Sequence, residues 1–316
     1  MSQAEHTARI AAQAGLLVVL GPLVTGYIQK LKARLQCRQG ASLWQPYRDL
    51  LKLLRKGTVQ SDSASSFFRA LPVLVLAASA ATTVMLPVLW APAGPASVPL
   101  GDAILLLALL ALGRFVSAVG ALDAGGAFGG MGASREMTVG LLVEPALMMA
   151  VFSVAVVGGT TDLVHLAARR ETLSTLAWQA PDLLALFAML VLALAETGRI
   201  PVDNPDTHLE LTMLHEGMLL EHSGPGLACL ALATHIKQIV ILGLVAALFF
   251  PLGLAESWRV ADVGLAGLAF ASKILVLATF LAVVESSYAK LRFFRVPQFL
   301  GLGLVSAFVA LALRIL

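Results

Sequence analysis

The chain has 316 residues, of which 58% are hydrophobic and only 13% are charged, and its formal net charge is +3. Soluble domains carry roughly 25% charged residues, so this composition excludes an ordinary water-soluble globular protein. The basic balance does not indicate nucleic-acid binding, because the Lys and Arg residues flank apolar stretches, as they do in membrane proteins.

Apolar runs of about 20 residues, the length that crosses a bilayer core, recur along the whole chain. Hydropathy predicts an all-α polytopic bundle of about eight transmembrane helices, near residues 9–29, 70–90, 102–120, 139–158, 181–197, 227–250, 262–284 and 298–316. The first run follows a short polar start without a compact cleavage site, which predicts a retained span rather than a signal peptide. No repeat or low-complexity linker divides the sequence, so residues 1–316 are expected to form a single transmembrane domain.

The first connection, residues 30–69, holds nine Lys and Arg and is expected to be a basic cytoplasmic loop. Within it, residues 47–56 are predicted to form a short amphipathic helix. One interpretation is an anchor on anionic lipid. The other is a docking surface for a partner protein, made of Arg34, Arg38, Gln45, Tyr47, Arg48 and Asp49. An even number of spans and a cytoplasmic first connection together predict that both chain ends lie on the outer side of the membrane.

The third connection, ALDAGGAFGGMGASREMTVG, is rich in glycine but lacks the strand and helix-capping context of a phosphate-binding loop. It is therefore predicted to be flexible, closely packed backbone. Asp123, Arg135 and Glu136 lie in it and add polar groups next to the fourth span. Connections such as APAGPASVPLGD, on the opposite side, are predicted to be plain turns.

Charged residues also fall inside the predicted spans. Glu144 lies about one turn into the fourth, and Lys237 and Lys273 lie near the middle of the sixth and seventh. A charge at the bilayer centre costs roughly 2.5–3.5 kcal/mol on insertion scales, so each is expected to pair with an opposite charge or to face water. A buried Glu–Lys pair that fixes helix register is one interpretation, and an ion relay is the other.

The fifth connection, residues 196–224, is expected to be an acidic cytoplasmic loop. Pro201 and Pro205 break the helix, which predicts irregular backbone beside protein or a watery cavity. Carboxylates crowded at a membrane entrance can share protons, because like charges raise one another's pKa. The predicted proton or ion path therefore includes Glu196, Asp203, Asp206, Glu210, Glu216 and Glu221, together with Glu144, Lys237 and Lys273.

Other polar residues receive a structural interpretation. His208, His215 and His222 recur every seven residues and would share one face of a helix, but HEGMLLEH does not fit the zinc-protease pattern. Glu285, Lys290 and Asp102 are interpreted as boundary residues at span ends. Two cysteines, Cys37 and Cys229, are too few for an iron–sulfur cluster. No catalytic, metal-binding or cofactor-binding residue is expected on this chain.

Four ordered blocks carry a family resemblance: GPLVTGYIQKLKARLQCRQGASLWQPYRDLLKLL, GALDAGGAFGGMGASREMTVGLLVEP, AETGRIPVDNPDTHLEL and HEGMLLEHSGPGLA. Together they resemble the respiratory complex I subunit 1 family. The GASRE…LLVEP and YRDLLKL stretches look most like the membrane subunits of group-four [NiFe] hydrogenases, of the hydrogenase-4 component C and formate hydrogenlyase subunit 4 type. Glu144, Glu196 and Asp203 match acidic positions of that family.

The resemblance implies a non-catalytic membrane subunit of an oxidoreductase complex in the cell membrane of a prokaryote. Such a subunit anchors hydrogenase-like large and small subunits, with antiporter-like membrane subunits alongside, and couples electron transfer to proton or sodium translocation. Iron–sulfur clusters, and a [NiFe] centre where it is retained, belong to the partners. The resemblance also allows a quinone at the cytoplasmic loops.

The acidic loop departs from the family pattern, because Asn204, Thr207 and His208 stand where acidic residues are usual. A quinone-site-forming subunit of a complex I-like or nickel-free relative therefore stays open as an alternative. A stand-alone ion transporter is a further alternative, although such proteins show paired broken helices in two related halves and this sequence shows one Pro-broken segment. A passive anchor would not need the intramembrane charges.

Overall fold

The computed structural model of the chain describes residues 3–59, 64–90, 101–173, 178–203, 214–255 and 259–316. Within these ranges the structure is helical, with no β-strand and two isolated bridges, Trp90 to Ala255 and Asp102 to Asp162. The helices are α1 (Gln3–Leu35), α2 (Gln45–Leu54), α3 (Ser66–Met85), α4 (Ala103–Asp123), α5 (Ala127–Gly158), α6 (Leu163–Leu173), α7 (Ala180–Glu196), α8 (His215–Leu219), α9 (Gly224–Phe249), α10 (Val260–Ser287), the 3₁₀ turn η2 (Phe293–Arg295) and α11 (Val296–Ile315).

The predicted fold class is confirmed, since each of the eight predicted spans falls on a helix. Seven helices in the described ranges are long and apolar enough to cross a membrane: α1, α3, α4, α5, α9, α10 and α11 with η2. The eighth, α7, has 17 residues. At 1.5 Å per residue it reaches about 26 Å, slightly less than the roughly 30 Å of a bilayer core. The chain is a multi-pass membrane protein.

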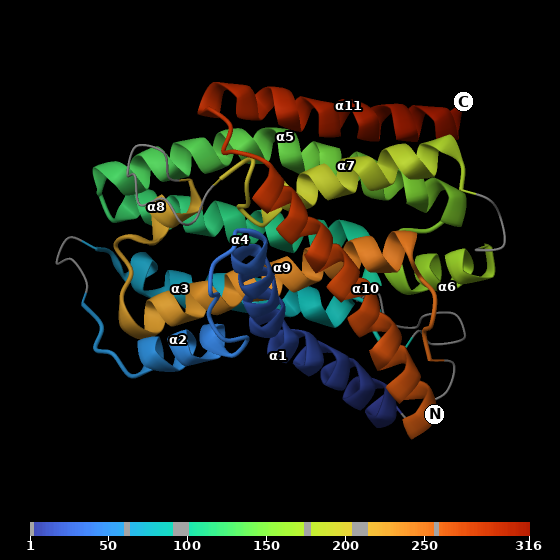
Figure 1. Cartoon of the computed structure of the whole chain (residues 1–316), viewed down its shortest axis with the longest axis horizontal. Coiled ribbons are helices and arrows are strands. Elements are labelled where there is room, and N and C mark those ends of the chain that lie inside the picture. Colours follow the sequence, from blue (N-terminus) through green and yellow to red (C-terminus); the bar gives the residue numbers. More distant parts are fainter. Residues whose placement is uncertain (1–2, 60–63, 91–100, 174–177, 204–213, 256–258) are drawn as a thin grey trace.

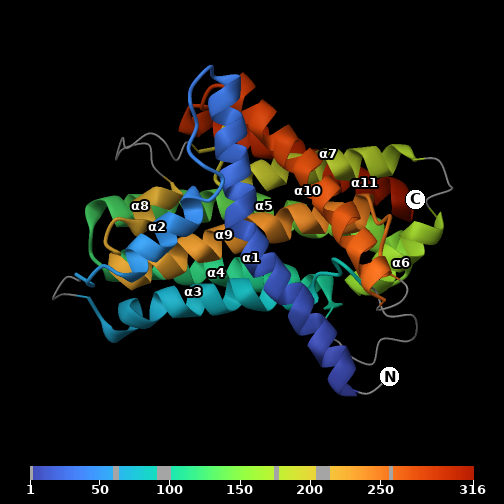
Figure 2. The same ribbon diagram turned by 60° about the horizontal axis from the view of Figure 1, so that its bottom comes forward.

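Helices α3, α4, α5, α7, α9 and α11 run side by side, and α1 and α10 cross them obliquely (Figures 1 and 2). Helix α9 is central and contacts α1, α2, α3, α6, α7 and α10. Helices α2 and α8 lie at one end of the bundle, whereas α6 and both ends of the chain lie at the other (Figure 1). The two chain ends lie at the same end of the bundle, which is consistent with an even number of membrane crossings.

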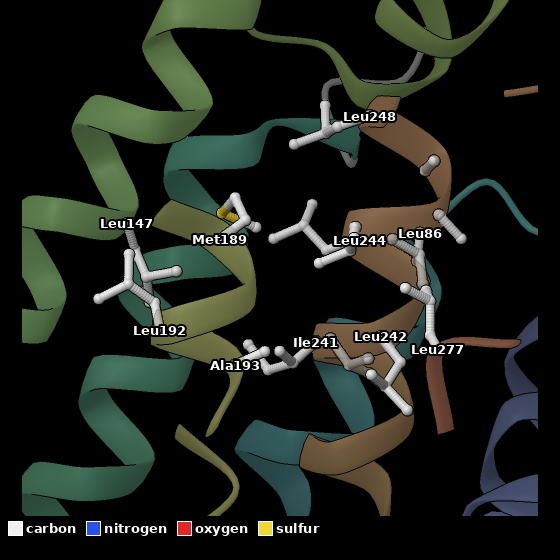
Figure 3. Close-up of a cluster of buried hydrophobic side chains, with 14 of the residues drawn as sticks. Leu86, Leu147, Met189, Leu192, Ala193, Ile241, Leu242, Leu244, Leu248 and Leu277 are labelled. Atoms are coloured by element: carbon white, nitrogen blue, oxygen red, sulfur yellow. The ribbon is translucent and has the colours of Figure 1, made fainter. Parts of the chain in front are cut away.

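The apolar core lies where α5, α7, α9 and α10 meet. Figure 3 shows side chains from these helices, and from the end of α3, pointing toward one another: Leu86, Leu147, Met189, Leu192, Ala193, Ile241, Leu242, Leu244, Leu248 and Leu277. All ten are buried. Because protein interiors are close-packed, this core fixes how the helices are rotated and hence which polar residues face one another.

Two predictions about the connections are wrong. The glycine-rich third connection is not flexible backbone but the first part of α5, which begins at Ala127. Its glycines permit close helix contact, since a Cβ at Gly129 would lie 2.9 Å from the carbonyl oxygen of Ala121 on α4. The connection after α5 is not a plain turn, because it contains α6. Helix α5 ends at Gly158 and is capped by Gly159, whose φ of 67° is the left-handed conformation that glycine adopts without strain.

Gly26 allows α1 to lie directly against the turn that precedes α2. A Cβ at this position would collide with the backbone carbonyl oxygen of Leu43 and lie 3.2 Å from Cδ of Pro46. Gly15, also in α1, has no atom within 4 Å of the same built position. A side chain would therefore meet neighbouring backbone at Gly26 but open space at Gly15.

Substitution of Gly26 by alanine is expected to lower the free energy of unfolding by about 1–3 kcal/mol, because α2 must shift away from α1. Gly15→Ala is the matched control and is expected to stabilise the helix by roughly 0.5–1 kcal/mol, since Ala has the higher helix propensity. Thermal unfolding of the purified protein in detergent measures both. Equal effects of the two substitutions would contradict the importance of this close contact.

Candidate functional site

A buried arginine near the middle of α4, Arg114, joins three carboxylates from two other helices. Its Nη1 lies 2.7 Å from Glu144 and its Nε lies 3.4 Å from Glu136, both on α5. Its Nη2 forms an ion pair with Glu196, the last residue of α7. One guanidinium can do this because it presents five N–H donors in a rigid planar fork. We call Arg114, Glu136, Glu144, Glu196 and Lys237 the Arg114 cluster.

Lys237 completes the cluster from α9, with its Nζ 2.7 Å from Oε2 of Glu196. Glu196 thus lies between two cations, and its side chain is only 1% exposed. A buried carboxylate without partners would be costly, so the two cations are what allows it to lie there ionised. The prediction that the carboxylates crowd against one another is therefore wrong for the described residues, since cations separate them.

A second ion-paired group surrounds Glu285, near the end of α10. The buried carboxylate lies 2.8 Å from Nζ of Lys32 on α1 and 2.9 Å from Nη1 of Arg199, which follows α7. Arg199 also donates to Oε1 of Gln238 on α9, at 3.0 Å. The interpretation of Glu285 as a boundary residue is wrong. It holds α1, α10 and the start of the acidic loop together.

Asp203 joins the described parts of the acidic loop. Its Oδ2 accepts from the backbone N–H groups of Leu214 at 3.3 Å and His215 at 3.4 Å. Its Oδ1 lies 3.0 Å from Nζ of Lys290, in the connection after α10. Lys290 is therefore an ion-pair partner and not only a boundary residue. The backbone around Asp203 is irregular, as the prolines predict.

Two cavities meet at the Arg114 cluster. One, of about 400 Å³ including space open to the outside, is lined by residues that include Glu196, Asp203, Gly198 and Val202. The other, of about 510 Å³ on the same measure, lies between α3, α4 and α9. Both are lined by Glu136, His215, Thr234 and Lys237. The ring Nε2 of His215 lies 3.2 Å from Oγ1 of Thr234, at this shared boundary.

The structure brings only some of the predicted path residues together. Glu144, Glu196 and Lys237 belong to the Arg114 cluster, and Asp203 lines the adjoining cavity. Asp206 and Glu210 lie outside the described residues. Glu216, on α8, and Glu221, beside Gly126, form no ion pair with the cluster in the described ranges.

Lys273 lies apart from the cluster. Its Nζ donates to the backbone carbonyl of Leu252, just beyond the end of α9. At 1.5 Å per helical residue, that end of α9 is about 18 Å from Lys237. The two lysines that the sequence groups together are therefore at different depths of the bundle.

Arg114, Arg199 and Gln238 were not predicted as site residues. Arg114 stands near the middle of the predicted span 102–120, so the intramembrane-charge rule that selects Lys237 also selects it. Arg199 and Gln238 give no such signal, because an arginine beside a helix end and a single amide in a span are common.

The predicted docking residues lie at the α2 end of the bundle. The predicted amphipathic helix is confirmed as α2, and Arg34, Arg38, Arg48 and Asp49 are exposed. Gln45 donates to Asp49 at 2.9 Å. Tyr47 instead faces α1, where its hydroxyl donates to the carbonyl of Val19, and burial raises the pKa of Tyr47. Tyr47 therefore positions α2 rather than presenting a polar group to a partner.

The histidines do not form the shared helix face that their spacing suggests. Helix α8 ends at Leu219, so His222 lies beyond it and stacks on Phe68 with ring centroids 4.2 Å apart. Burial lowers the pKa of His222, which favours the neutral ring. His208 lies outside the described residues. Over the ranges that the structure covers, no group of three or more His, Cys, Asp or Glu side chains is placed to hold a metal ion.

Comparison with known proteins gives one family. A family model described as NADH dehydrogenase matches residues 8–315. Hydrogenase-4 component C of Escherichia coli (strain K12) is 35% identical over 301 residues, which are 95% of this chain and 93% of that protein. Formate hydrogenlyase subunit 4 of the same organism is 33% identical, over 94% of this chain and 95% of that protein. A chain in the structure of the membrane-bound sulfane sulfur reductase, an archaeal respiratory membrane complex, shares the fold, with a TM-score of 0.77, 19% identity and coverage of 96% and 99%.

Proposed function

Because the chain belongs to the NADH dehydrogenase family, that of complex I subunit 1, we propose that it is the energy-coupling membrane subunit of a complex I-like, hydrogenase-type complex. The resemblance to this family and to its hydrogenase members is confirmed by these relatives. In this role the chain anchors a peripheral arm and links electron transfer in that arm to ion translocation across the membrane.

The Arg114 cluster is the observation that carries this proposal. It draws charged side chains from α4, α5, α7 and α9 into the interior of the bundle, within reach of two cavities. Intramembrane charges of this kind are expensive and mark ion pathways by default. Asp203 lines one of these cavities, which supports a path that runs from the acidic loop into the membrane.

We propose protons rather than sodium as the transported ion. Each carboxylate of the cluster is paired with Arg114, and Glu196 also with Lys237. Fixed cations beside each carboxylate repel Na⁺, which requires several oxygen ligands, so the cluster is poorly suited to binding sodium.

The finer assignments follow from the family role. We propose that the α2 end faces the cytoplasm, where Arg34, Arg38 and Arg48 dock the hydrogenase-like large and small subunits, and that antiporter-like subunits lie alongside in the cell membrane. The redox centres then belong to the partners, with [NiFe] or quinone chemistry set by them. The positive charge of the exposed α2 end supports this orientation by the positive-inside rule.

The substitution Glu196→Gln tests the coupling role. It keeps the shape of the side chain but removes the group that exchanges a proton, so proton translocation is expected to fall by at least about a hundredfold. The measurement is proton uptake by inverted membrane vesicles that contain the whole complex, supplied with its electron donor. Copurification of the peripheral subunits checks assembly.

Asp182→Asn is the matched control, because Asp182 lies at the other end of α7 and also forms a buried ion pair, 2.8 Å from Arg314. It is expected to leave translocation within twofold of the unsubstituted complex. Full translocation by an assembled Glu196→Gln complex would overturn the coupling role and leave a passive anchor.

A further inference from the structure

The two cavities at the Arg114 cluster meet at a shared boundary. The first, which we call the loop-side cavity, is lined by Gly198 and Asp203 of the acidic loop. The second, which we call the bundle cavity, lies between α3, α4 and α9 and is lined by Arg114. Four of the described residues line both cavities, namely Glu136, His215, Thr234 and Lys237. A proton that moves from one cavity to the other passes between these side chains.

His215 differs from the other titratable residues at this boundary. Glu136 lies 3.4 Å from Nε of Arg114, and Lys237 lies 2.7 Å from Glu196, so each of these charges already has a partner. His215 forms no ion pair within the part of the chain that the structure describes. An imidazole is also the side chain that ordinarily gains and loses a proton near neutral pH. Of the four boundary residues, His215 is therefore the one best suited to change its charge.

The hydroxyl of Thr234 determines which ring nitrogen of His215 can take up a proton. Its Oγ1 donates to the backbone carbonyl oxygen of Leu230, one turn earlier on α9, at 3.0 Å. This bond uses the single hydrogen of the hydroxyl, so Nε2 of His215 is the donor in its 3.2 Å contact with Oγ1. In the neutral ring, Nδ1 then carries no hydrogen. Nδ1 is therefore the site where a proton binds.

His215 is held at the boundary from two directions. Its ring is bonded to Thr234 on α9, and its backbone N–H donates to Oδ2 of Asp203 at 3.4 Å. It is also the first residue of α8, which contacts α4 and α5. The charged residues that line the same cavities come from other elements, namely Glu136 on α5, Lys237 on α9, Glu196 and Asp203 on the loop side and Arg114 on α4. The ring is therefore fixed where the acidic loop meets the Arg114 cluster.

We propose that His215 is the residue that transfers protons between the loop-side cavity and the bundle cavity. Nδ1 takes up one proton from water in the loop-side cavity, which makes the ring an imidazolium. The same proton then passes to water or to a carboxylate on the side of the bundle cavity, which restores the neutral ring. Nε2 keeps its hydrogen and its bond to Thr234 throughout. This inference rests on the proposed function, because it assigns a residue to the proton path proposed above.

A substitution that keeps the hydrogen bond of His215 tests the transfer of protons. In His215→Gln, the side-chain amide can still donate to Thr234 but cannot carry a proton, so proton uptake by vesicles that contain the whole complex is expected to fall at least about tenfold. Copurification of the peripheral subunits checks assembly. His222→Phe is the matched control, because it removes an imidazole outside both cavities and keeps a ring to stack on Phe68. It is expected to stay within twofold of the unsubstituted complex.

Chemical rescue separates proton transfer from a structural role. His215→Ala leaves space for a small base at the boundary, so imidazole added to the vesicles is expected to restore at least half of the lost proton uptake. Pyrazole has the same size but is a far weaker base, and it is expected to restore none. Each rate is compared with that of the unsubstituted complex in the same additive. Equal restoration by the two compounds, or restoration by neither, would overturn the proposal.

The outcomes also distinguish this inference from the coupling role. Full proton uptake by an assembled His215→Gln complex, while Glu196→Gln is inactive, would overturn the role of His215 and leave the coupling role intact. Full uptake by both variants would overturn the coupling role as well. Imidazole is not expected to restore Glu196→Gln, because that variant still has its histidine.

Discussion

Replacement of Arg114 by glutamine is expected to abolish proton translocation and to destabilise the membrane bundle by about 3–5 kcal/mol, the loss that follows when one partner of a buried ion pair is removed. Three carboxylates depend on this guanidinium, and Glu196 among them is buried. Without it, the cluster must take up protons or let water in. Either change disrupts the ion pairs that make up the proposed proton path.

The measurement combines thermal unfolding of the purified complex with proton uptake by vesicles. A double substitution, Arg114→Gln with Glu144→Gln, is the matched comparison, because it removes a positive and a negative charge together. The double variant is expected to lose less unfolding free energy than the two single variants lose in total, which indicates a direct interaction between the two residues. Additive effects would show that the ion pair contributes nothing.

Arg114→Lys distinguishes charge from geometry. A lysine keeps one positive charge but not the planar fork that reaches Glu136, Glu144 and Glu196 from three nitrogens. We therefore expect this variant to fold but to translocate more slowly than the unsubstituted complex. Full activity of Arg114→Lys would mean that charge alone is sufficient.

Substitution of Glu285 by glutamine is expected to have the second-largest effect, again about 3–5 kcal/mol, because it leaves Arg199 and Lys32 beside a neutral group in a buried site. The expected result is a lower unfolding temperature and loss of the contact between α1 and α10. The ion pair of Glu285 lies outside the Arg114 cluster, so whatever complex assembles is expected to retain coupling.

Lys32→Gln is the control for Glu285→Gln. Lys32 is 12% exposed, and its removal leaves Glu285 still paired with Arg199, so the expected loss is smaller, on the order of 1.5–3 kcal/mol. Thermal unfolding ranks the two variants. A larger loss for Lys32→Gln than for Glu285→Gln would contradict the buried site that the structure shows.

Much of the fold follows from the sequence, because the bilayer fixes both the length and the polarity of a crossing helix. The predicted span at 262–284, for example, lies entirely within α10. The glycine-rich start of α5 was not predicted as helix, since intrinsic propensity opposes it. Contact with α4, through glycines such as Gly129, outweighs that propensity.

The sequence indicates several individual residues of the site, but it does not indicate which of them contact one another. Glu144 and Lys237 were selected because an isolated charge in a span needs a partner. Their partners, Arg114 and Glu196, depend on how four helices are rotated about their own axes, which the packed core determines and hydropathy does not reveal. Lys273 shows the same limit. It lies as near the middle of its predicted span as Lys237 does, yet its Nζ donates to the backbone carbonyl of Leu252 and not to the Arg114 cluster.

The central position of Arg114 also has a consequence for biosynthesis. Helix α4 leaves the ribosome before α5 and α7, so its arginine reaches the membrane before Glu144 and Glu196, which follow it by 30 and 82 residues, can lie beside it there. The translocon must therefore accept α4 on its own apolar content. Its mean hydropathy of 2.2 is as high as that of any span in the described ranges, which offsets the cost of one early arginine.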